Sequence, residues 1–235
     1  MFTFKQFTIH QNACAMKVGT DGVLLGAWCS VENAVRVLDV GTGTGLIALM
    51  IAQRVPQVQI EAVELDERAA EQARYNVSLT PWKNRIKVIA TSVQQFAESN
   101  SGLYDAVVCN PPYFVDSLKS PDDSRTKARH ADTLTHYDLL RSAQNLLSHQ
   151  GALYVILPTV EADIFIEKST QYGFFLAFCT HVLPTPQSAV KRKLMGFVRE
   201  SNKVLLLEKQ LVIEQERHLY TDEYKALTKE FYLKL

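Results

Sequence analysis

The sequence predicts one α/β domain with a Rossmann-like, mostly parallel sheet, and three observations lead to this fold class. Short β-branched and apolar runs alternate with helical patterns along the chain. The length of 235 residues suits one sizeable domain and leaves little room for a second. There are no internal repeats and no low-complexity tracts. We therefore expect helices on both faces of one sheet, with ligands bound beyond the carboxyl ends of its strands.

The first half of the chain supplies four strands of this sheet. The expected strands are 35–40, 59–64, 85–90 and 104–109, and the expected helices are 46–54 and 67–79. In the second half, Thr135-x-x-Asp138 has the pattern of a capping box that opens a helix. Further strands are expected at 151–157, 174–182 and 193–199, with a helix at 161–172 that ends at Gly173. A β-rich stretch at 204–213 follows, and the tail 223–235 should dock on the core.

The composition is that of an ordinary soluble protein, with 47% hydrophobic and 21% charged residues. Lys plus Arg equals Asp plus Glu, 25 against 25, so any surface for nucleic acid must be local. The four cysteines, Cys14, Cys29, Cys109 and Cys179, form no CxxC pair, which predicts reduced, buried thiols and no metal. The N-terminus lacks the apolar core of a signal peptide, and no apolar run is long enough to cross a bilayer. We expect a cytoplasmic protein.

A glycine-rich turn, Leu38 to Gly45, lies between the first strand and the first helix of the sheet. Its glycines permit a tight turn and let a ligand approach the backbone closely. A dinucleotide site stays open as an alternative, but its fingerprint needs glycine where Leu46 stands. Asp39 would repel a pyrophosphate and can face a cationic group, which favours an aminoacyl-nucleoside. Glu64 ends the next strand, where a carboxylate can accept hydrogen bonds from ribose hydroxyls.

The tetrapeptide Asn110-Pro111-Pro112-Tyr113 follows the fourth strand. The Asn110 side-chain oxygen and the Pro111 carbonyl can accept both N–H bonds of a planar amino group. Accepting both draws the nitrogen towards tetrahedral geometry and localises its lone pair for attack on a methyl donor. The prolines stiffen the turn in advance, and Tyr113 can stack on a planar acceptor. Away from a glycine-rich ligand site, the same tetrapeptide would be interpreted as a surface turn.

These motifs, in this order, resemble class I methyltransferases, which use S-adenosylmethionine. The resemblance implies a seven-stranded sheet with the last strand antiparallel. The run from Lys17 to Trp28 looks like the element that closes over the methionine end of the cofactor. From Phe2-Thr3-Phe4-Lys5-Gln6-Phe7-Thr8 to the Phe231-Tyr232-Leu233 ending, the chain resembles bacterial valine-tRNA adenine-N6 methyltransferases. Those enzymes modify the adenine beside the anticodon.

The resemblance implies a single domain, 1–235, with a segment 1–34 that closes over the cofactor. The catalytic core is then 35–235 and includes a β-rich C-terminal extension. The residues expected to hold the acceptor base are Asn110, Pro111 and Tyr113. The residues expected to bind the cofactor are Lys17, Gly19, Thr20, Asp21, Asp39, Gly41, Gly43, Glu64, Ser92 and Asn110. Relatives place Asp where this chain has Ser92, so the bond to the cofactor's adenine is neutral and shorter in reach.

An RNA substrate requires local basic surface, and two segments offer it. The candidate RNA-binding residues are Arg125, Lys127, Arg129 and His130 after the catalytic turn, and Lys191, Arg192 and Lys193 before a late strand. Solvated loops carry such charges without binding RNA, and Asp122 and Asp123 dilute the first cluster. An anticodon-loop adenine is partly unpaired, so little flipping energy would be needed.

Other acceptors and roles remain open at this point. A protein-glutamine methyltransferase would hold a side-chain amide in the same turn, but such enzymes carry a helical N-terminal domain, and only 34 residues precede the first strand. A DNA-adenine enzyme would normally add a target-recognition domain. A ribosomal guanine-N2 enzyme usually has Phe after the two prolines and a duplicated domain. The non-enzymatic alternative is an RNA-binding protein on the same fold, which would not need Asp39, Glu64 and Asn110 together.

Overall fold

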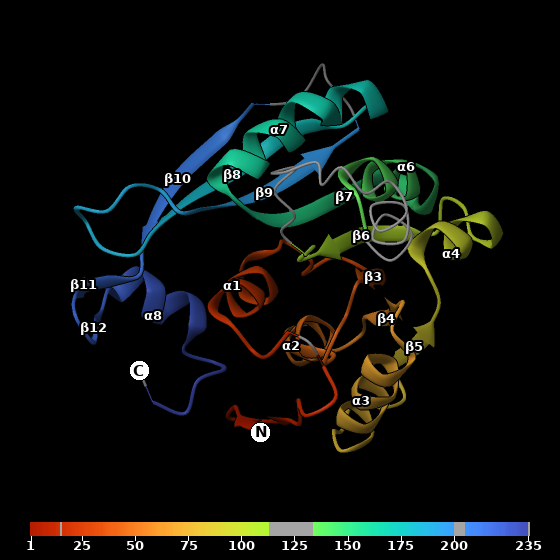
Figure 1. The fold of residues 1–235 in the computed structure, drawn as a ribbon, viewed down its shortest axis with the longest axis horizontal. Coiled ribbons are helices and arrows are strands. Elements are labelled where there is room, and N and C mark those ends of the chain that lie inside the picture. Colours follow the sequence, from red (N-terminus) through yellow and green to blue (C-terminus); the bar gives the residue numbers. More distant parts are fainter. Residues whose placement is uncertain (15, 113–133, 200–204, 235) are drawn as a thin grey trace, which may run out of the picture.

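The computed structural model describes residues 1–14, 16–112, 134–199 and 205–234 (Figure 1). The strands are β1 (Phe2–Thr3), β2 (Thr8–Ile9), β3 (Arg36–Val40), β4 (Gln59–Glu64), β5 (Ile86–Ala90), β6 (Tyr104–Cys109), β7 (Leu147–Pro158), β8 (Phe175–Leu183), β9 (Arg192–Val198), β10 (Leu207–Val212), β11 (Glu214–Glu216) and β12 (Leu219–Tyr220). The helices are α1 (Thr20–Trp28), α2 (Leu46–Arg54), α3 (Glu67–Ser78), α4 (Val93–Ser99), α6 (His136–Leu146), α7 (Thr159–Ser169), the 3₁₀ turn η1 (Thr170–Tyr172) and α8 (Asp222–Thr228).

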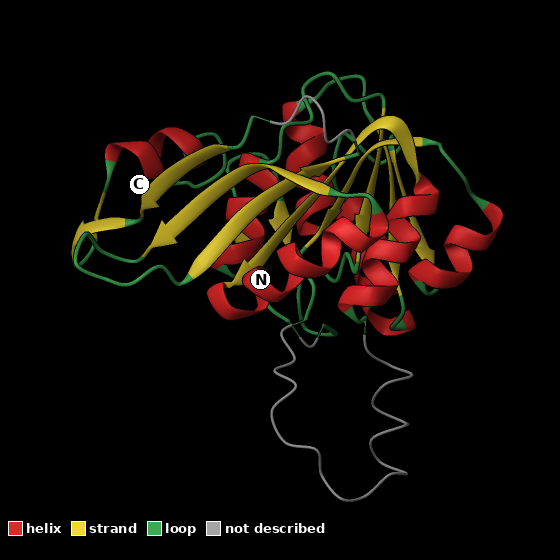
Figure 2. Ribbon diagram, turned by 90° about the horizontal axis from the view of Figure 1, so that it is seen from above, coloured by secondary structure: helices red, strands yellow, loops and turns green. Residues whose placement is uncertain are grey.

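The main sheet has the strand order β10-β8-β9-β7-β6-β3-β4-β5. Neighbouring strands from β7 to β5 are parallel, whereas β9 runs antiparallel to both β7 and β8. Figure 2 views this sheet from above and shows its twist from one edge to the other. The predicted α/β class is confirmed, but the count of seven strands is wrong, because the described residues form eight. The additional strand, β10, pairs in parallel with β8 and extends the sheet at that edge.

Successive side chains along the strands point to opposite faces of the sheet, so the core has two apolar layers. In β3 and β6, Val37, Ala106 and Val108 belong to one buried cluster, while Leu38 and Val107 belong to the other. The first layer lies beneath α1, α2, α3 and α8, and the second beneath α4, α6 and α7 (Figure 1). Both faces of the parallel strands are therefore covered, as their nearly continuous apolar sequences require.

Most predicted elements lie within a few residues of their expected bounds. The capping box is present, because the Thr135 hydroxyl accepts from the Asp138 N–H and the Asp138 carboxylate accepts from Thr135. Gly173 follows η1 with a left-handed φ of 73°, as expected of a helix-ending glycine. The tail also docks, since Phe231 is only 2% exposed.

Helix α1 was not predicted as a helix, and its sequence explains why. It has two glycines in nine residues and is buried from Gly22 to Ala27, so it lacks an amphipathic pattern. The glycines allow close contact with α2: a Cβ on Gly22 would lie 3.1 Å from Leu46 Cδ2, and one on Gly26 would lie 2.9 Å from Met50 Sδ. Spaced four residues apart on each helix, these pairs form one seam.

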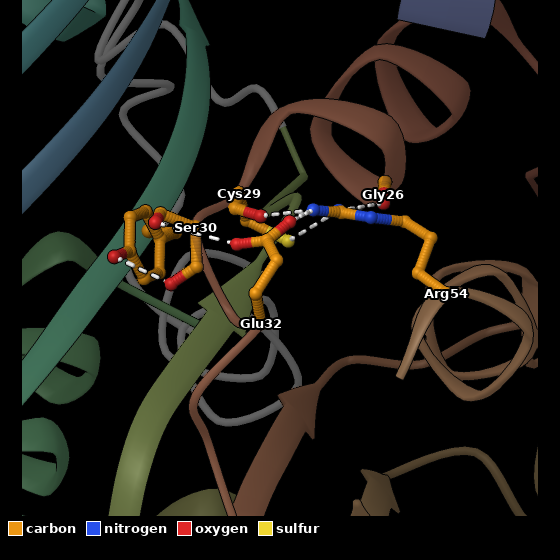
Figure 3. Close-up of polar contacts among 6 residues, drawn as sticks. Gly26, Cys29, Ser30, Glu32 and Arg54 are labelled. Atoms are coloured by element: carbon orange, nitrogen blue, oxygen red, sulfur yellow. Dashed lines mark hydrogen bonds and ion pairs between the residues drawn. The ribbon is translucent and has the colours of Figure 1, made fainter. Parts of the chain in front are cut away.

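The carboxyl end of α1 is fastened to α2 by Arg54 (Figure 3). The Arg54 guanidinium donates to the carbonyl oxygens of Gly26 at 2.8 Å and Cys29 at 2.9 Å. It also forms an ion pair with Glu32. These bonds satisfy carbonyls that a helix end leaves without intrahelical donors. They join the carboxyl ends of α1 and α2, while the first turn of α1 lines the cavity described below.

The four cysteines are buried free thiols, as predicted. None of the helices in the described part of the chain has the length and apolarity needed to span a bilayer.

Candidate active site

A cavity of about 1010 Å³ opens at the carboxyl ends of β3, β4, β5 and β6. This is the edge of a parallel sheet where ligands are expected to bind, and the volume accommodates a nucleoside with space beside it. Most of the predicted site residues line it. These are Lys17, Gly19, Thr20, Asp21, Gly41, Gly43, Glu64, Ser92, Asn110 and Pro111. These residues come from five segments separated in sequence, and the four that follow strand ends converge as the topology predicted.

The glycine-rich turn forms the floor of this cavity. Gly41 and Gly43 have φ values of 66° and 56°, which side chains other than glycine rarely adopt. A Cβ atom on either would meet no other atom within 4 Å, so the space above the backbone is open to a ligand. The N–H of Gly41 donates to the Val63 carbonyl at 2.9 Å. The turn is thus fixed to the end of β4 before any ligand binds.

Asp39 lies beneath this turn and does not line the cavity. Its side chain is fully buried, and Oδ2 accepts hydrogen bonds from the Thr42 hydroxyl at 2.6 Å and the Ala48 N–H at 3.2 Å. The second bond places the carboxylate at the N-terminal turn of α2, where the helix dipole favours negative charge. Among the described residues, Oδ1 has no hydrogen-bond partner. Burial raises the pKa of Asp39 to about 7, against the lowering effect of the two hydrogen bonds.

The two side chains proposed for the nucleoside end also hold backbone. Glu64 Oε2 accepts from the Gly43 N–H at 2.8 Å, and Oε1 accepts from the Asp66 N–H at 3.1 Å. A carboxylate has about four acceptor positions, so capacity remains for two ribose hydroxyls. Ser92 is the N-cap of α4, where Oγ accepts from the Gln95 N–H at 3.2 Å. Its hydroxyl proton is still able to donate into the cavity.

The Asn110-Pro111-Pro112 turn leaves β6 at the cavity wall. Pro111 is buried and Asn110 half-buried, so the first part of this turn packs within the protein. A Cβ on Gly22 would lie 3.9 Å from Asn110 Nδ2, which places the amide beside the first turn of α1. The amide therefore lies next to a helix that packs closely on α2 through Gly22 and Gly26. Tyr113 lies outside the described residues.

An ion pair joins the first turn of α1 to the start of β9. Arg192 Nε donates to Asp21 Oδ2 at 2.8 Å, and both side chains are only partly exposed, 30% and 22%. Both residues also line the cavity. Since 171 residues separate them, this pair closes the cavity wall between the N-terminal segment and the late strands.

The proposed RNA-binding residues are divided by the alternation of β9. Arg192 faces the cavity, whereas Lys193 Nζ donates to Asp163 of α7 at 2.5 Å on the opposite side of the strand. Lys193 is 14% exposed, so its expected contact with RNA is not supported by its position. Lys191 is exposed. Arg125, Lys127, Arg129 and His130 lie outside the described residues.

Several cavity residues were missed by sequence reasoning. Asp66 and Thr91 follow β4 and β5, and their place past strand ends was the signal that could have found them. Gly22 belongs to the Lys17–Trp28 run that was expected to close over the cofactor, but it was not singled out as a site residue. Asn76 supports the site from behind: its Nδ2 donates to the carbonyls of His10 at 2.8 Å and Thr44 at 2.9 Å. This fully buried side chain joins the N-terminal segment to the glycine-rich turn.

The thiols near the cavity are poor nucleophiles. Burial and, to a smaller extent, the charges of nearby Glu64 and Asp66 raise the pKa of Cys14 to about 11. Burial also raises the pKa of Cys109 well above its usual range. Both thiols are therefore protonated near neutral pH. The described wall thus offers positioning groups and charge rather than a covalent catalyst.

The residues present fit S-adenosylmethionine. The open backbone above Gly41 and Gly43 admits close approach, and Glu64 can take ribose hydroxyls. Among the charged residues that line the cavity, the carboxylates of Asp21, Glu64 and Asp66 outnumber the cations of Lys17 and Arg192, which suits a ligand that carries an ammonium and a sulfonium but no phosphate. The fold and this cavity define a class I methyltransferase.

Comparisons with known proteins agree with this class. Residues 23–162 match the family described as Methyltransferase small domain. The tRNA1(Val) (adenine(37)-N6)-methyltransferase of Bacteroides fragilis is 46% identical over 237 residues, covering 100% of this chain and 98% of the relative. The enzyme of that name from Trichodesmium erythraeum is 48% identical, covering 99% and 98%. The chain belongs to the tRNA1(Val) (adenine(37)-N6)-methyltransferase family.

A solved structure supports the fold. The chain described as a predicted O-methyltransferase from Agrobacterium tumefaciens superposes with a TM-score of 0.73 at 22% identity, covering 90% of this chain and 96% of that one. At this identity the likeness speaks for the architecture alone.

Proposed function

We propose that this protein transfers a methyl group from S-adenosylmethionine to the exocyclic N6 amine of adenine 37 in tRNA1(Val). The observation that carries the proposal is the position of Asn110 and Pro111 in the same cavity as the glycine-rich turn. The full-length likeness to enzymes named for this reaction supports the choice of substrate. A planar amine bound at Asn110 and Pro111 would lie next to a methyl donor bound at the glycine-rich turn.

The reaction needs little from the protein beyond placement and charge. When bound, S-adenosylmethionine supplies an electrophilic methyl carbon on a sulfonium. Asn110 Oδ1 and the Pro111 carbonyl oxygen accept the two N–H bonds of the adenine amine and aim its lone pair at that carbon. Both acceptors stand on a turn stiffened by two prolines, so their reorganisation cost is low. The surplus proton leaves the methylated nitrogen after transfer, with no base needed beforehand.

Some of the proposed cofactor residues contact the cofactor, and Asp39 supports the site from beneath. Lys17, Gly19, Thr20 and Asp21 enclose the methionine end, while Glu64 and Ser92 hold the nucleoside. Asp39 acts from beneath by holding Thr42 and by its field, rather than by direct contact. Its partnerless Oδ1 leaves negative charge that a cationic cofactor offsets.

The RNA is expected to approach the mouth of the cavity, where Lys17 and Lys191 are exposed. Arg192 lines the wall nearby and suits a phosphate close to the flipped adenine. Tyr113, Arg125, Lys127 and Arg129 remain predictions for this surface. We place the protein in the cytoplasm, where its tRNA substrate is found.

The Asn110→Ala variant tests the proposal with S-adenosylmethionine carrying a radiolabelled methyl group. The substrates are tRNA1(Val) lacking the modification and the same RNA with guanine at position 37, followed by nucleoside analysis. We expect label in N6-methyladenine only, and a loss in kcat of roughly 100- to 1000-fold in the variant. Cofactor affinity, measured by calorimetry, should change less than about threefold, because this side chain holds the acceptor.

Asn145→Ala is the matched control, because Asn145 is exposed on α6, away from the cavity. Label recovered in guanine and not in adenine would refute the proposed acceptor. Unchanged turnover in Asn110→Ala would refute the acceptor site itself. Binding of the RNA without any transfer of the labelled methyl group would indicate an RNA-binding protein on a methyltransferase fold.

A further inference from the structure

A cluster of potential metal ligands lies at the edge of the sheet, outside the cavity. Cys179 and His181 are two residues apart on β8 and face the same side. Glu208 of β10 is the register partner of Cys179, so it projects beside them. One ligand atom from each of the three lies within 4.8 Å of the others. His181 Nε2 is 3.8 Å from Cys179 Sγ and 3.3 Å from Glu208 Oε1.

The two distances from His181 Nε2, 3.8 Å to sulfur and 3.3 Å to oxygen, are within a few tenths of an ångström of those between ligands on a tetrahedral zinc ion. With bonds of about 2.3 Å to sulfur and about 2.0–2.2 Å to nitrogen or oxygen, neighbouring ligand atoms lie roughly 3.3–3.6 Å apart. Thiolate and imidazole together select zinc over magnesium or calcium, which prefer oxygen. We propose that Cys179, His181 and Glu208 bind one zinc ion.

The charges around the cluster suit a divalent ion. Binding converts the Cys179 thiol to a thiolate and releases its proton to solvent, so thiolate and Glu208 carboxylate together balance the ion. Lys193, the register partner of His181 on β9, would oppose a cation, but its ammonium is bound to Asp163 at 2.5 Å. That neighbouring pair is neutral as a whole and leaves the balance unchanged.

Burial gives the site a closed side and an open side. Cys179 is 2% exposed and belongs to the apolar cluster beneath α7, whereas the Glu208 side chain is 56% exposed. A fourth ligand is therefore water from the solvent side. The ion would join β10 to β8, and the segment after β10 carries β11, β12 and α8. The sequence pointed to no metal because Glu208 lies 27 residues from His181, without ligand spacing of a familiar kind.

Metal content tests the proposal without reference to catalysis. The full chain is produced with zinc in the medium, desalted without chelator, and analysed by plasma mass spectrometry. We expect about one zinc per chain in the wild type and less than about one tenth in Cys179→Ser and His181→Ala. Glu208→Gln changes an exposed side chain and should fold normally, with zinc released more readily to a weak chelator. Glu216→Gln and His149→Ala, at exposed positions elsewhere, should keep the wild-type content.

Absorption of the cobalt-substituted protein provides a second test of the site. Zinc-free wild type loaded with Co²⁺ should show a near-ultraviolet thiolate-to-cobalt band, absent from Cys179→Ser. Cofactor binding by each variant shows that it is folded. A wild type with no stoichiometric metal and no cobalt band would overturn the proposal and leave a hydrogen-bonded cluster. Full zinc content in folded Cys179→Ser and His181→Ala would overturn it equally, by placing the metal elsewhere.

Discussion

Replacing Asp39 by asparagine is expected to stabilise the cofactor-free protein above neutral pH. The Asp39 carboxylate is fully buried, receives hydrogen bonds at Oδ2 only, and has its pKa raised by burial to about 7. The unfolded chain ionises this group near its ordinary value of 3.8. Between those two values the native state holds a proton that the unfolded state has lost, so stability falls as pH rises through this window.

The size of the effect follows from the two pKa values. Each pKa unit is worth about 1.4 kcal/mol, so at pH 8 the buried charge costs about 4 kcal/mol. Asparagine removes that cost and keeps an oxygen for Thr42 and Ala48. Its NH₂ group then replaces Oδ1 without an acceptor, which costs about 1–3 kcal/mol. We expect a net gain of about 1–3 kcal/mol at pH 8 and almost none at pH 5, where the native carboxyl is mostly protonated.

Urea unfolding of both proteins at pH 5 and pH 8, followed by circular dichroism, measures this difference. Asp222→Asn is the control, because Asp222 is 96% exposed and its replacement should change stability by less than about 0.5 kcal/mol at either pH. A less stable Asp39→Asn variant at pH 8, or a gain of equal size at both pH values, would refute the reasoning. The first result would mean that the carboxylate is compensated in the native protein, and the second that its charge is irrelevant.

Three further experiments test the cavity and its supports. Glu64→Gln should weaken cofactor binding roughly 10- to 100-fold in calorimetry, because charge-assisted hydrogen bonds are lost; unaltered affinity would exclude Glu64 as a ligand. Gly26→Ala should destabilise by about 1–2 kcal/mol, since overpacking against Met50 exceeds the gain in helix propensity, and Met50→Val should recover part of it. A double-mutant cycle with Asp21→Asn and Arg192→Gln should give a coupling energy of about 1 kcal/mol; additive effects would show that the pair contributes nothing.

The sequence was sufficient wherever structure is encoded locally. The glycine-rich turn, the capping box at Thr135 and the alternating strands each depend on residues a few positions apart, so their patterns are visible without the fold. The convergence of the turn, Glu64 and Asn110 was predictable as well, since parallel strands end at one edge.

The rest depends on contacts between distant residues. Arg192 pairs with Asp21 across 171 positions. Strand alternation places Arg192 and Lys193 on opposite faces, but no local pattern shows which of the two faces the cavity. Helix α1 is hidden for a similar reason, because a helix buried on most sides loses the periodicity that marks helices. The hydrogen bonds of Asp39 were also not predictable, since they depend on where α2 begins relative to β3.

The eighth strand has a consequence for solubility. As the outermost strand in the sheet order, β10 pairs only with β8 in the described chain and presents its other backbone edge outward. Such an edge can recruit a strand from a second molecule and start aggregation. Here the middle of the edge is Glu208-Lys209-Gln210, all exposed, between leucines at 207 and 211. Pairing with an apolar strand would remove the charged side chains of Glu208 and Lys209 from water, which costs free energy. The sequence of β10 therefore disfavours edge-to-edge association.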